Sequence, residues 1–462
     1  MQDADYSSFI ANKRVAIEPS GFSVEHVNSN LFDWQADIVR WALRVGRCGL
    51  FEQPGLGKTI QQLSWADEVV RRGGVKRLLL LCPLAIAKQT LREAERFGIQ
   101  SEVRVCRDSS QVDSGINITN YERIHKFDCS VFDAVVCDES GILKGLGPTR
   151  ELLTTAFART RYKLPCTATP APNDYMELGN HAEFIGTMSR SEMLSMFFVH
   201  DGGDTSKWRL RGHAEQAFWR WMCEWSVMIR KPSDLGYSDK GYTLPPLRIH
   251  DIVVNAEIDS NALIDLGAKT LSERRTARRD SIEDRVGEAA ELANANPNEP
   301  WVSWCGLNEE SRLLAREIQG AVEVTGSDSP EYKEEMFEAF VSGQLKKLVS
   351  KASIFGWGAN FQHCCKTSFV GMSDSFEELF QAIRRFYRFG QKKPVDAYLI
   401  ISSREGAVSD NIRRKERDFE EMLDAMAANM SDITSAAVRG SSRLSTPYSP
   451  QKRMELPSWL MA

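Results

Sequence analysis

Short apolar runs alternate with helical patterns along most of this sequence, and the alternation restricts the folds open to it. In the first half, amphipathic stretches such as Thr59–Arg72 and Ile86–Phe97 separate the apolar runs. Strands that are apolar throughout and interleaved with helices are typical of a parallel sheet covered on both faces. The predicted strands are Cys48–Phe51, Arg77–Cys82, Ile116–Thr119, Ala134–Cys137 and Tyr162–Thr167.

A second series of the same kind begins near Trp301. Helical patterns at Glu309–Ile318, Pro330–Phe340 and Phe376–Phe389 separate its strands. Because the chain has 462 residues, it is too long for one hydrophobic core. We therefore predict an α/β fold of two doubly wound parallel-sheet lobes. The strands predicted for the second lobe are Trp301–Cys305, Ala321–Val324, Lys347–Val349, Ser368–Gly371 and Val395–Ile401.

The chain divides into four predicted units. Residues 1–184 form the first lobe, and residues 249–405 form the second lobe, with a charged helical segment at 260–298. Residues 185–248 form a helical insert and linker. Residues 406–462 form a C-terminal helix, Asn411–Ala428, and a tail rich in Ser, Arg and Pro.

For two segments of the chain, the sequence allows two alternative roles each. The insert contains four tryptophans, for which a small helical core is expected and a protrusion resting on nucleic acid is the alternative. The charged stretch Leu271–Glu291 carries arginines on neighbouring turns, which form a solvated face or, alternatively, contact phosphates. The residues concerned are Trp208, Trp219, Trp221, Trp225, Arg274, Arg275, Arg278 and Arg279.

Composition argues against several classes of protein. No apolar run is long enough to span a membrane, and no basic segment followed by an apolar one marks a secretory signal. Ten cysteines are scattered without C-x-x-C pairs, which favours reduced thiols and a cytoplasmic location. Cys364 and Cys365 beside His363 are not expected to bind metal, because adjacent cysteines rarely chelate one ion. A net charge of −5 leaves DNA binding open, since local clusters of Lys and Arg decide it.

The segment Gln53–Thr59 follows a predicted strand and opens a predicted helix. Backbone amides at a helix N-terminus bind phosphate, and Gly55 and Gly57 let the backbone approach it. Lys58 is expected on the β- and γ-phosphates of ATP, and Thr59 on Mg²⁺. The strict phosphate-loop spacing fails at one position, because residue 52 is Glu.

Two further segments complete a nucleotide site in the first lobe. Asp138 and Glu139 end an apolar strand, where Asp138 is expected to hold Mg²⁺ and Glu139 to orient or deprotonate the attacking water. The hydroxyl-rich turn Thr167–Pro170 closes the strand Tyr162–Thr167 and is a candidate link between the ATP site and motion of the other lobe.

Basic residues cluster in the second lobe, where Gln381–Pro394 contains five of them and no acid. A helix would place Arg385 and Arg388 on one face, because they are three residues apart. Across a cleft from the phosphates, both would stabilise charge in phosphoryl transfer as arginine fingers do. For Arg384, contact with DNA is an equally good interpretation.

In order and spacing, these motifs resemble those of superfamily 2 helicases, and most closely the Snf-type DNA translocases. The resemblance extends from about Leu31 to Ile401 and implies two RecA-like lobes, the first of which binds ATP. Further segments are similar to the family's motifs, namely Leu31–Gln35 with Trp41, Leu80–Leu84, Ile118–Glu122, Asp138–Lys144, Thr167–Asn173 with Glu177, Met228–Lys231 with Leu244–Pro246, Gly356–Asn360 and Gln381–Gln391.

The resemblance also implies roles for individual residues. Gln35 is expected to read the adenine, and Gly356, Gly358 and Gln381 are expected at the nucleotide. Contact with nucleic acid is expected for Pro83, Thr119, Asn120, Lys144, Asn360 and Arg384.

Two departures from the family pattern stand out. Gly141 occupies the place that His or Gln usually fills in the acidic motif, so the coupling contact made there is in question. Phe355 and Trp357 make the glycine-containing motif around residues 356–360 bulkier than usual. With its compact length and Trp-rich insert, the chain looks like the short helicases encoded by bacteriophages, which would place it in the cytoplasm of a bacterial host.

The motifs predict an ATP hydrolase that needs Mg²⁺ and moves on or remodels duplex, forked or single-stranded DNA. A monomer or loose oligomer is expected, with replication or recombination proteins as possible partners and no membrane association. The alternatives are an ATP-gated nucleic-acid clamp or annealing factor, and an RNA helicase. The Gly390-Gln391 ending and the segment that joins the lobes favour DNA over RNA.

Overall fold

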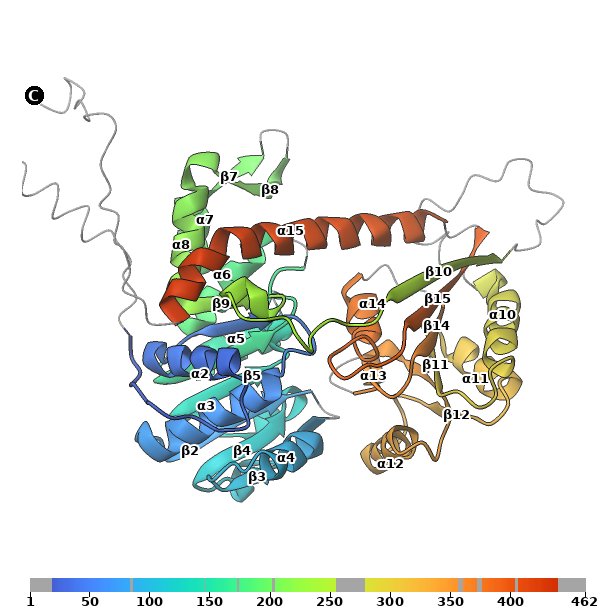
Figure 1. Cartoon of the computed structure of the whole chain (residues 1–462), viewed down its shortest axis with the longest axis horizontal. Helices are drawn as coiled ribbons and strands as arrows, with labels where there is room; N and C mark the ends of the chain where they lie inside the picture. Colours follow the sequence, from blue (N-terminus) through green and yellow to red (C-terminus); the bar gives the residue numbers. More distant parts are fainter. Residues whose placement is uncertain are drawn as a thin grey trace, which may run out of the picture.

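Two layered α/β lobes lie side by side in the computed structural model of the chain (Figure 1). The first lobe is built from the N-terminal half, and the second from residues after 246. The structure describes residues 19–83, 86–145, 147–172, 174–201, 204–254, 279–355, 360–371, 376–403 and 406–438.

The first lobe is centred on a seven-stranded sheet in which all neighbouring strands run parallel. Its strand order is β3-β4-β2-β5-β6-β1-β9, which requires helical crossovers between sequential strands. The strands are β1 Gly49–Glu52, β2 Arg77–Cys82, β3 Val103–Val105, β4 Gly115–Asn120, β5 Ala134–Asp138, β6 Tyr162–Thr167 and β9 Ser226–Ile229.

Helices cover both faces of this sheet. Buried side chains of α2, α3 and α4 pack on one face, and those of α5 and α6 pack on the other. Strand side chains alternate between the two clusters, as Leu78 and Leu79 do, so every strand must be apolar on both sides. The helices are α2 Asp33–Val45, α3 Lys58–Arg72, α4 Ala87–Arg96, α5 Pro148–Ala156 and α6 Leu178–Ile185.

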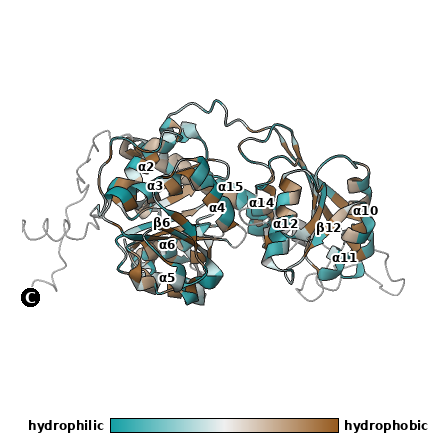
Figure 2. Ribbon diagram, turned by 90° about the horizontal axis from the view of Figure 1, so that it is seen from below, coloured by the Kyte–Doolittle hydropathy of each residue, from teal (hydrophilic) through white to brown (hydrophobic). Residues whose placement is uncertain are grey.

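The second lobe has a six-stranded parallel sheet with the order β10-β15-β14-β11-β13-β12. In both lobes the apolar strands lie inside, between helices with hydrophilic outer faces (Figure 2). The predicted fold class of two doubly wound lobes is confirmed. The elements are β10 Leu247–Val254, α10 Ile282–Asn294, β11 Trp301–Cys305, α11 Asn308–Glu317, β12 Ala321–Val324, α12 Pro330–Val341, β13 Lys347–Lys351, α13 Ala352–Phe355, β14 Lys366–Val370, α14 Phe376–Ile383 and β15 Val395–Ser402.

The segment between the lobes is more varied than the predicted helical insert. Helix α7 (Arg190–Phe197) leads into an antiparallel hairpin of β7 (Phe198–Asp201) and β8 (Asp204–Leu210), and α8 (Glu215–Trp225) follows. The side chains of Trp219, Trp221 and Trp225 are buried in the core of the first lobe, where they pack on Phe218, Phe197 and Phe51. Three of the four tryptophans are therefore core residues as predicted, but they belong to the core of the first lobe, and Trp208 on β8 is only partly buried.

Helix α15 (Gly406–Val438) runs from the second lobe back across the first (Figure 1). It is longer than the predicted helix at residues 411–428. Near its middle, the Phe419 ring packs on Phe376 of α14, with ring centroids 5.5 Å apart. Near its end, Ser435 Oγ donates to the Leu235 carbonyl at 3.2 Å. The helix therefore joins both lobes through buried contacts.

Some sequence predictions lie outside the described residues. These are Gly356, Trp357, Gly358, Asn173, the arginines at 274, 275 and 278, and the tail after residue 438. Within the described residues, none of the helices has the length and apolar character needed to cross a bilayer.

Candidate nucleotide site between the lobes

The glycine-containing loop connects β1 to α3 and is shaped by two left-handed residues. Gly55 has φ 92° and Gly57 has φ 78°, conformations that glycine adopts without steric cost. Lys58 is the first residue of α3, and its Nζ donates to the Glu52 carbonyl at 2.8 Å. Thr59 follows in the first turn. The first amides of α3 therefore lie where an anion is favoured.

Gln35 of α2 is held against this loop. Its Nε2 donates to the Leu56 carbonyl at 2.7 Å, and its Oε1 accepts from the Phe32 amide at 3.0 Å. A Cβ on Gly57 would lie 2.5 Å from Gln35 Nε2, so a side chain at position 57 would displace the glutamine. The predicted adenine reader is therefore adjacent to the loop and supports its backbone.

Glu52, where the loop departs from the strict spacing, is fully buried below it. Gln61 Nε2 donates to Glu52 Oε2 at 2.8 Å, whereas Oε1 has no hydrogen-bond partner among the described residues. Burial raises the pKa of this carboxyl to about 7, against a smaller opposite effect of Lys58. Glu52 therefore titrates near neutrality while Lys58 is bound to its backbone carbonyl.

Asp138 is the last residue of β5, and Glu139 follows it. Gln62 Nε2 donates to Asp138 Oδ1 at 2.7 Å, and the Tyr121 hydroxyl donates to the Asp138 carbonyl at 2.7 Å. Glu139 has φ 49°, and among the described residues it alone has a positive φ without being glycine. Such strained conformations cost about 1–3 kcal/mol and cluster at functional sites.

The charges of this pair fit a bound cation. Burial, and then the neighbouring Glu139, raise the pKa of Asp138 to about 6. Glu139 Oε2 is buried without a hydrogen-bond partner among the described residues. A cation would offset both the repulsion and the unpaired oxygen. The predicted Mg²⁺ ligands, Asp138 and Thr59, are therefore compatible with this chemistry.

The arginine segment reaches the acidic pair from the second lobe. Arg385 Nη2 lies 3.7 Å from Glu139 Oε1, and burial lowers the pKa of Arg385 to about 10. Arg385 Nη2 also donates to Gln381 Oε1 at 3.1 Å. Burial lowers the pKa of Arg388 as well, and Glu93, Glu139 and Asp138 oppose that shift. Both arginines therefore lie in the electric field of the first lobe's carboxylates.

The helix predicted for this segment is too long, because α14 ends at Ile383. The carbonyls that a continuing helix would use are bonded elsewhere. The Phe361 amide donates to the Arg385 carbonyl at 2.9 Å, and Gln391 Nε2 donates to the Phe386 carbonyl at 3.2 Å. As a result, Arg385 and Arg388 lie in turns after the helix. A Cβ on Gly55 would lie only 2.7 Å from the Phe389 amide nitrogen, so this turn packs directly on the phosphate loop.

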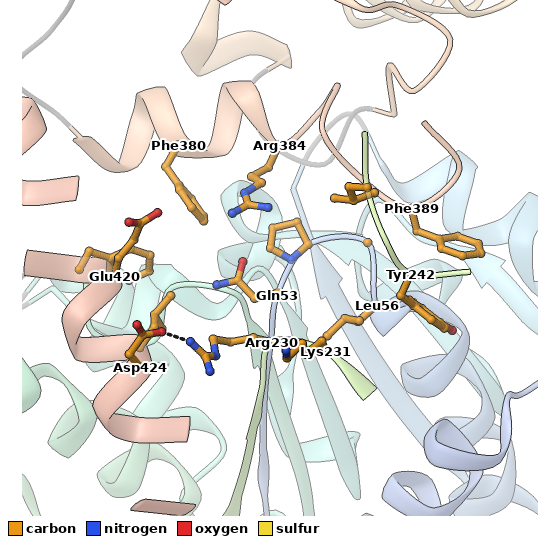
Figure 3. A pocket seen from close by; sticks show the side chains of 15 residues that line it. Gln53, Leu56, Arg230, Lys231, Tyr242, Phe380, Arg384, Phe389, Glu420 and Asp424 are labelled. Atoms are coloured by element: carbon orange, nitrogen blue, oxygen red, sulfur yellow. Dashed lines mark ion pairs between the residues drawn. The ribbon is translucent and has the colours of Figure 1, made fainter. Parts of the chain in front are cut away.

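Arg384 points away from the acidic pair. Its guanidinium lies over the rings of Phe380 and Tyr387, at 4.9 and 5.4 Å from their centroids, and Glu416 and Glu420 of α15 offset part of the burial that lowers its pKa. Figure 3 shows this side chain at a cavity that Gln53 and Leu56 of the loop also line. The cavity has a volume of about 410 Å³. An ion pair between Arg230 and Asp424 closes another side of the cavity.

The residues predicted to contact nucleic acid differ in how exposed their side chains are. Thr119 is 1% exposed and Asn120 is 3% exposed, and Asn120 Oδ1 caps the following turn by accepting from the Arg123 amide. Both side chains are thus enclosed in this structure, and their contact with nucleic acid stays a prediction. Pro83 and Asn360 are partly exposed. Lys144 forms an ion pair with Glu377 of the second lobe, which places it in the lobe interface.

Several contributors to the site are absent from the sequence predictions. Gln62 and Tyr121 hold Asp138, and Glu377 reaches the first lobe. Gln62 lies three residues after Thr59 on α3, and Glu377 lies four residues before Gln381 on α14. Helical spacing therefore gives a signal for both, since residues three or four apart share a helix face.

The fold and the site define a two-lobed α/β protein with a glycine-containing loop and an acidic pair in one lobe and arginines from the other. A family model described as the SNF2-related domain matches residues 34–198. The first lobe therefore contains a match to the SNF2-related domain, in agreement with the resemblance to Snf-type proteins that the sequence predicted.

Two curated proteins are similar to part of the chain. "Protein CHROMATIN REMODELING 8" of Arabidopsis thaliana is 32% identical over 117 residues, which are 24% of this chain and 10% of that protein. "DNA excision repair protein CSB" of Oryza sativa subsp. japonica is 33% identical over 90 residues, 19% of this chain and 8% of that protein. The chain thus matches only a tenth or less of the length of these relatives.

One similar solved structure is titled "Sulfolobus solfataricus SWI2/SNF2 ATPase core in complex with dsDNA". It has 18% sequence identity and a TM-score of 0.42, and the alignment covers 91% of this chain and 98% of that chain.

Proposed function

We propose that this protein hydrolyses ATP between its lobes and uses the cycle to move on or remodel duplex DNA. The observation that carries the proposal is the pairing of Arg385 with Glu139 across the lobe interface, at 3.7 Å. An arginine from one lobe beside the acidic pair of the other gives a site that is complete only when the lobes meet.

The first lobe supplies the binding half of this site. The amides around Gly57 and the ammonium of Lys58 would hold the ATP phosphates, and Gln35 is suited to the adenine because it lies beside the loop. Mg²⁺, held by Thr59 and Asp138, would neutralise charge on the phosphates when bound. Glu139 then orients the attacking water, for which its Oε2 has no competing partner among the described residues.

The second lobe supplies positive charge for the transition state. Arg385 and Arg388 are positioned to stabilise the charge that develops on the transferred phosphoryl group. Because both belong to the second lobe, lobe closure would raise the rate of hydrolysis, and phosphate release would favour opening. Repeated closing and opening could then move one lobe relative to the other along a strand.

DNA is the proposed partner. The two relatives are named for chromatin remodelling and DNA excision repair. On the first lobe, basic side chains follow the carboxyl end of strand β4, and they are more exposed than Thr119 and Asn120. They are Arg123 and Lys126. A duplex phosphate backbone would suit these side chains.

The direct test is hydrolysis of ATP with no nucleic acid, duplex DNA, single-stranded DNA, forked DNA or RNA. We expect strong stimulation by duplex-containing DNA, and a rate that falls as salt weakens the phosphate contacts. Stimulation by RNA alone would assign the protein to RNA instead. Equal rates under all conditions would remove nucleic acid from the proposal.

A further inference from the structure

Glu377 lies in the first turn of α14 and contacts the first lobe at two places. Its carboxylate forms an ion pair with Lys144, and the Thr169 hydroxyl donates to Glu377 Oε1 at 3.2 Å. The side chains of Lys144 and Glu377 are each 17% exposed. This is a largely buried ion pair between lobes, unlike the solvent-exposed pair of Arg92 and Glu338 at another edge.

Further residues on the same side of α14, and just after it, connect Glu377 to the acidic pair. Gln381, one turn later, donates through Nε2 to Thr169 Oγ1 at 3.4 Å, and its Oε1 accepts from Arg385 at 3.1 Å. Arg385 then meets Glu139. A continuous series of polar contacts therefore runs from Lys144 through Glu377, Thr169, Gln381 and Arg385 to Glu139.

The first lobe presents Lys144 and Thr169 from fixed backbone. Asn180 Nδ2 donates to the Lys144 carbonyl, and the Thr169 amide donates to Thr167 Oγ1 at 3.1 Å. On the same side, Ser140 Oγ lies 3.2 Å from His181 Nε2 of α6. Because these groups are held by the core of the first lobe, Glu377 connects the second lobe to a rigid surface.

Gly141 leaves the space that this contact uses. A Cβ at position 141 would lie 3.5 Å from Glu377 Oε1, 3.8 Å from Lys144 Nζ and 4.0 Å from Thr167 Oγ1. A longer side chain at this position would extend into the cluster and compete with Glu377 for Lys144. Because Gly141 has no side chain, the Glu377 carboxylate has room to pair with Lys144.

We infer that Glu377 is a positioning residue, which takes over the coupling contact that Gly141 cannot make and sets Arg385 against Glu139. Lys144 accordingly belongs to the lobe interface, not to a nucleic-acid surface. This inference rests on the proposed function, because the positioning of Arg385 matters only if the site hydrolyses ATP.

The test compares the parent protein with Glu377→Gln, which keeps the shape and the acceptor for Thr169 but removes the charge. We expect kcat for ATP in the presence of duplex DNA to fall on the order of tenfold, a usual size for coupling between sites. KM for ATP should stay within about threefold, because the first lobe binds the phosphates. Glu334→Gln is the matched control, since Glu334 pairs with Lys88 across the same interface, away from Thr169.

Charge exchange makes the test specific to the pair. Lys144→Glu should lose activity because it places two carboxylates together, and Lys144→Glu with Glu377→Lys should recover most of the loss. An exchanged protein no better than the worse single variant would overturn the inference. A parental kcat in Glu377→Gln would also overturn it, and so would an equal loss of kcat in Glu334→Gln.

A second measurement is independent of hydrolysis. Hydrogen exchange of the backbone amides at 139–145 and 167–169 should be faster in Glu377→Gln than in the parent or in Glu334→Gln. If the parent shows no ATP hydrolysis at all, the proposed function fails, and this measurement still decides whether Glu377 holds the interface. Unchanged exchange in Glu377→Gln would contradict the inference.

Discussion

Arg385 and Glu139 lie in different lobes, and the guanidinium of one is 3.7 Å from the carboxylate of the other. Glu139 is held in a left-handed backbone conformation, and Arg385 is held by Gln381. Each partner is therefore placed by its own lobe, and the distance between them depends on how the lobes meet.

The roles of Lys58 and Glu139 can be separated. Lys58→Ala should abolish hydrolysis and weaken ATP binding, because the phosphates lose their positive partner. Glu139→Gln should keep ATP binding and stop turnover, since the loop and Asp138 remain while the water loses its orienting carboxylate. Binding of a fluorescent ATP analogue and phosphate release measure the two effects. A Glu139→Gln protein that turns over at the parental rate would show that the acidic pair is misassigned.

Arg388 should be needed for turnover. We expect Arg388→Ala to slow hydrolysis on the order of a thousandfold, as loss of an arginine finger does. Arg384→Ala is the comparison, because Arg384 lies over Phe380 and Tyr387 instead of facing Glu139. Single-turnover phosphate release at saturating ATP gives both rates. Equal effects of the two changes would assign Arg388 to a structural role or to DNA.

Gly55 should be intolerant of a side chain for two separate reasons. Its φ of 92° strains any other residue, and a Cβ would lie 2.7 Å from the Phe389 amide nitrogen. Gly74→Ala introduces the backbone strain without the steric clash, because Gly74 has φ 73° and nothing within 4 Å of its Cβ position. We expect Gly55→Ala to lower kcat at least tenfold more than Gly74→Ala, while both lose about 1 kcal/mol of stability from backbone strain. Similar kcat values would mean that Phe389 need not approach the loop.

Glu52→Gln should change how stability depends on pH. The folded protein holds a proton on Glu52 up to about pH 7, whereas the unfolded chain releases it near the ordinary value of 4.5. The unfolded state therefore binds fewer protons in this window, and Glu52 lowers the free energy of unfolding as pH rises from 4.5 through 7.

In Glu52→Gln the decrease in the free energy of unfolding between pH 4.5 and 7 should disappear. The variant should gain up to about 3 kcal/mol over the parent above pH 7 and little below pH 4.5, from the size of the pKa shift. Urea unfolding at several pH values measures the difference. A stability difference between the two proteins that does not change with pH would show that Glu52 is ionised to the same extent in both states.

The strands could be predicted from sequence where they are apolar on both faces. Tyr162–Thr167 and Trp301–Cys305 have the predicted bounds, because a central strand between two helical layers must be apolar throughout. Strand β10 was missed since it is an edge strand, and its residues Leu247–Val254 alternate between partly buried and exposed. Strand β9 has only four residues and directly follows α8.

The site was predictable in its parts but not in its connections. The loop, the acidic pair and the arginines stand out as motifs. The contact between Thr169 and Glu377 joins residues 208 apart in the chain, which no local pattern reveals. For the same reason the length of α14 was overestimated, because Phe361, which is distant in the sequence, takes the Arg385 carbonyl after the end of the helix. Thr119 and Asn120 were placed correctly at a strand end, but their burial depends on tertiary packing.

In the proposed function, closure of the lobes on ATP drives movement along duplex DNA. Displacement of a fluorescent third strand from a DNA triplex tests it most directly, because the third strand leaves only when a protein moves along the duplex. We predict ATP-dependent displacement by the parent protein, and none by Glu139→Gln at the same duplex occupancy. DNA-stimulated hydrolysis by the parent without any displacement would contradict the claim and favour an ATP-gated clamp.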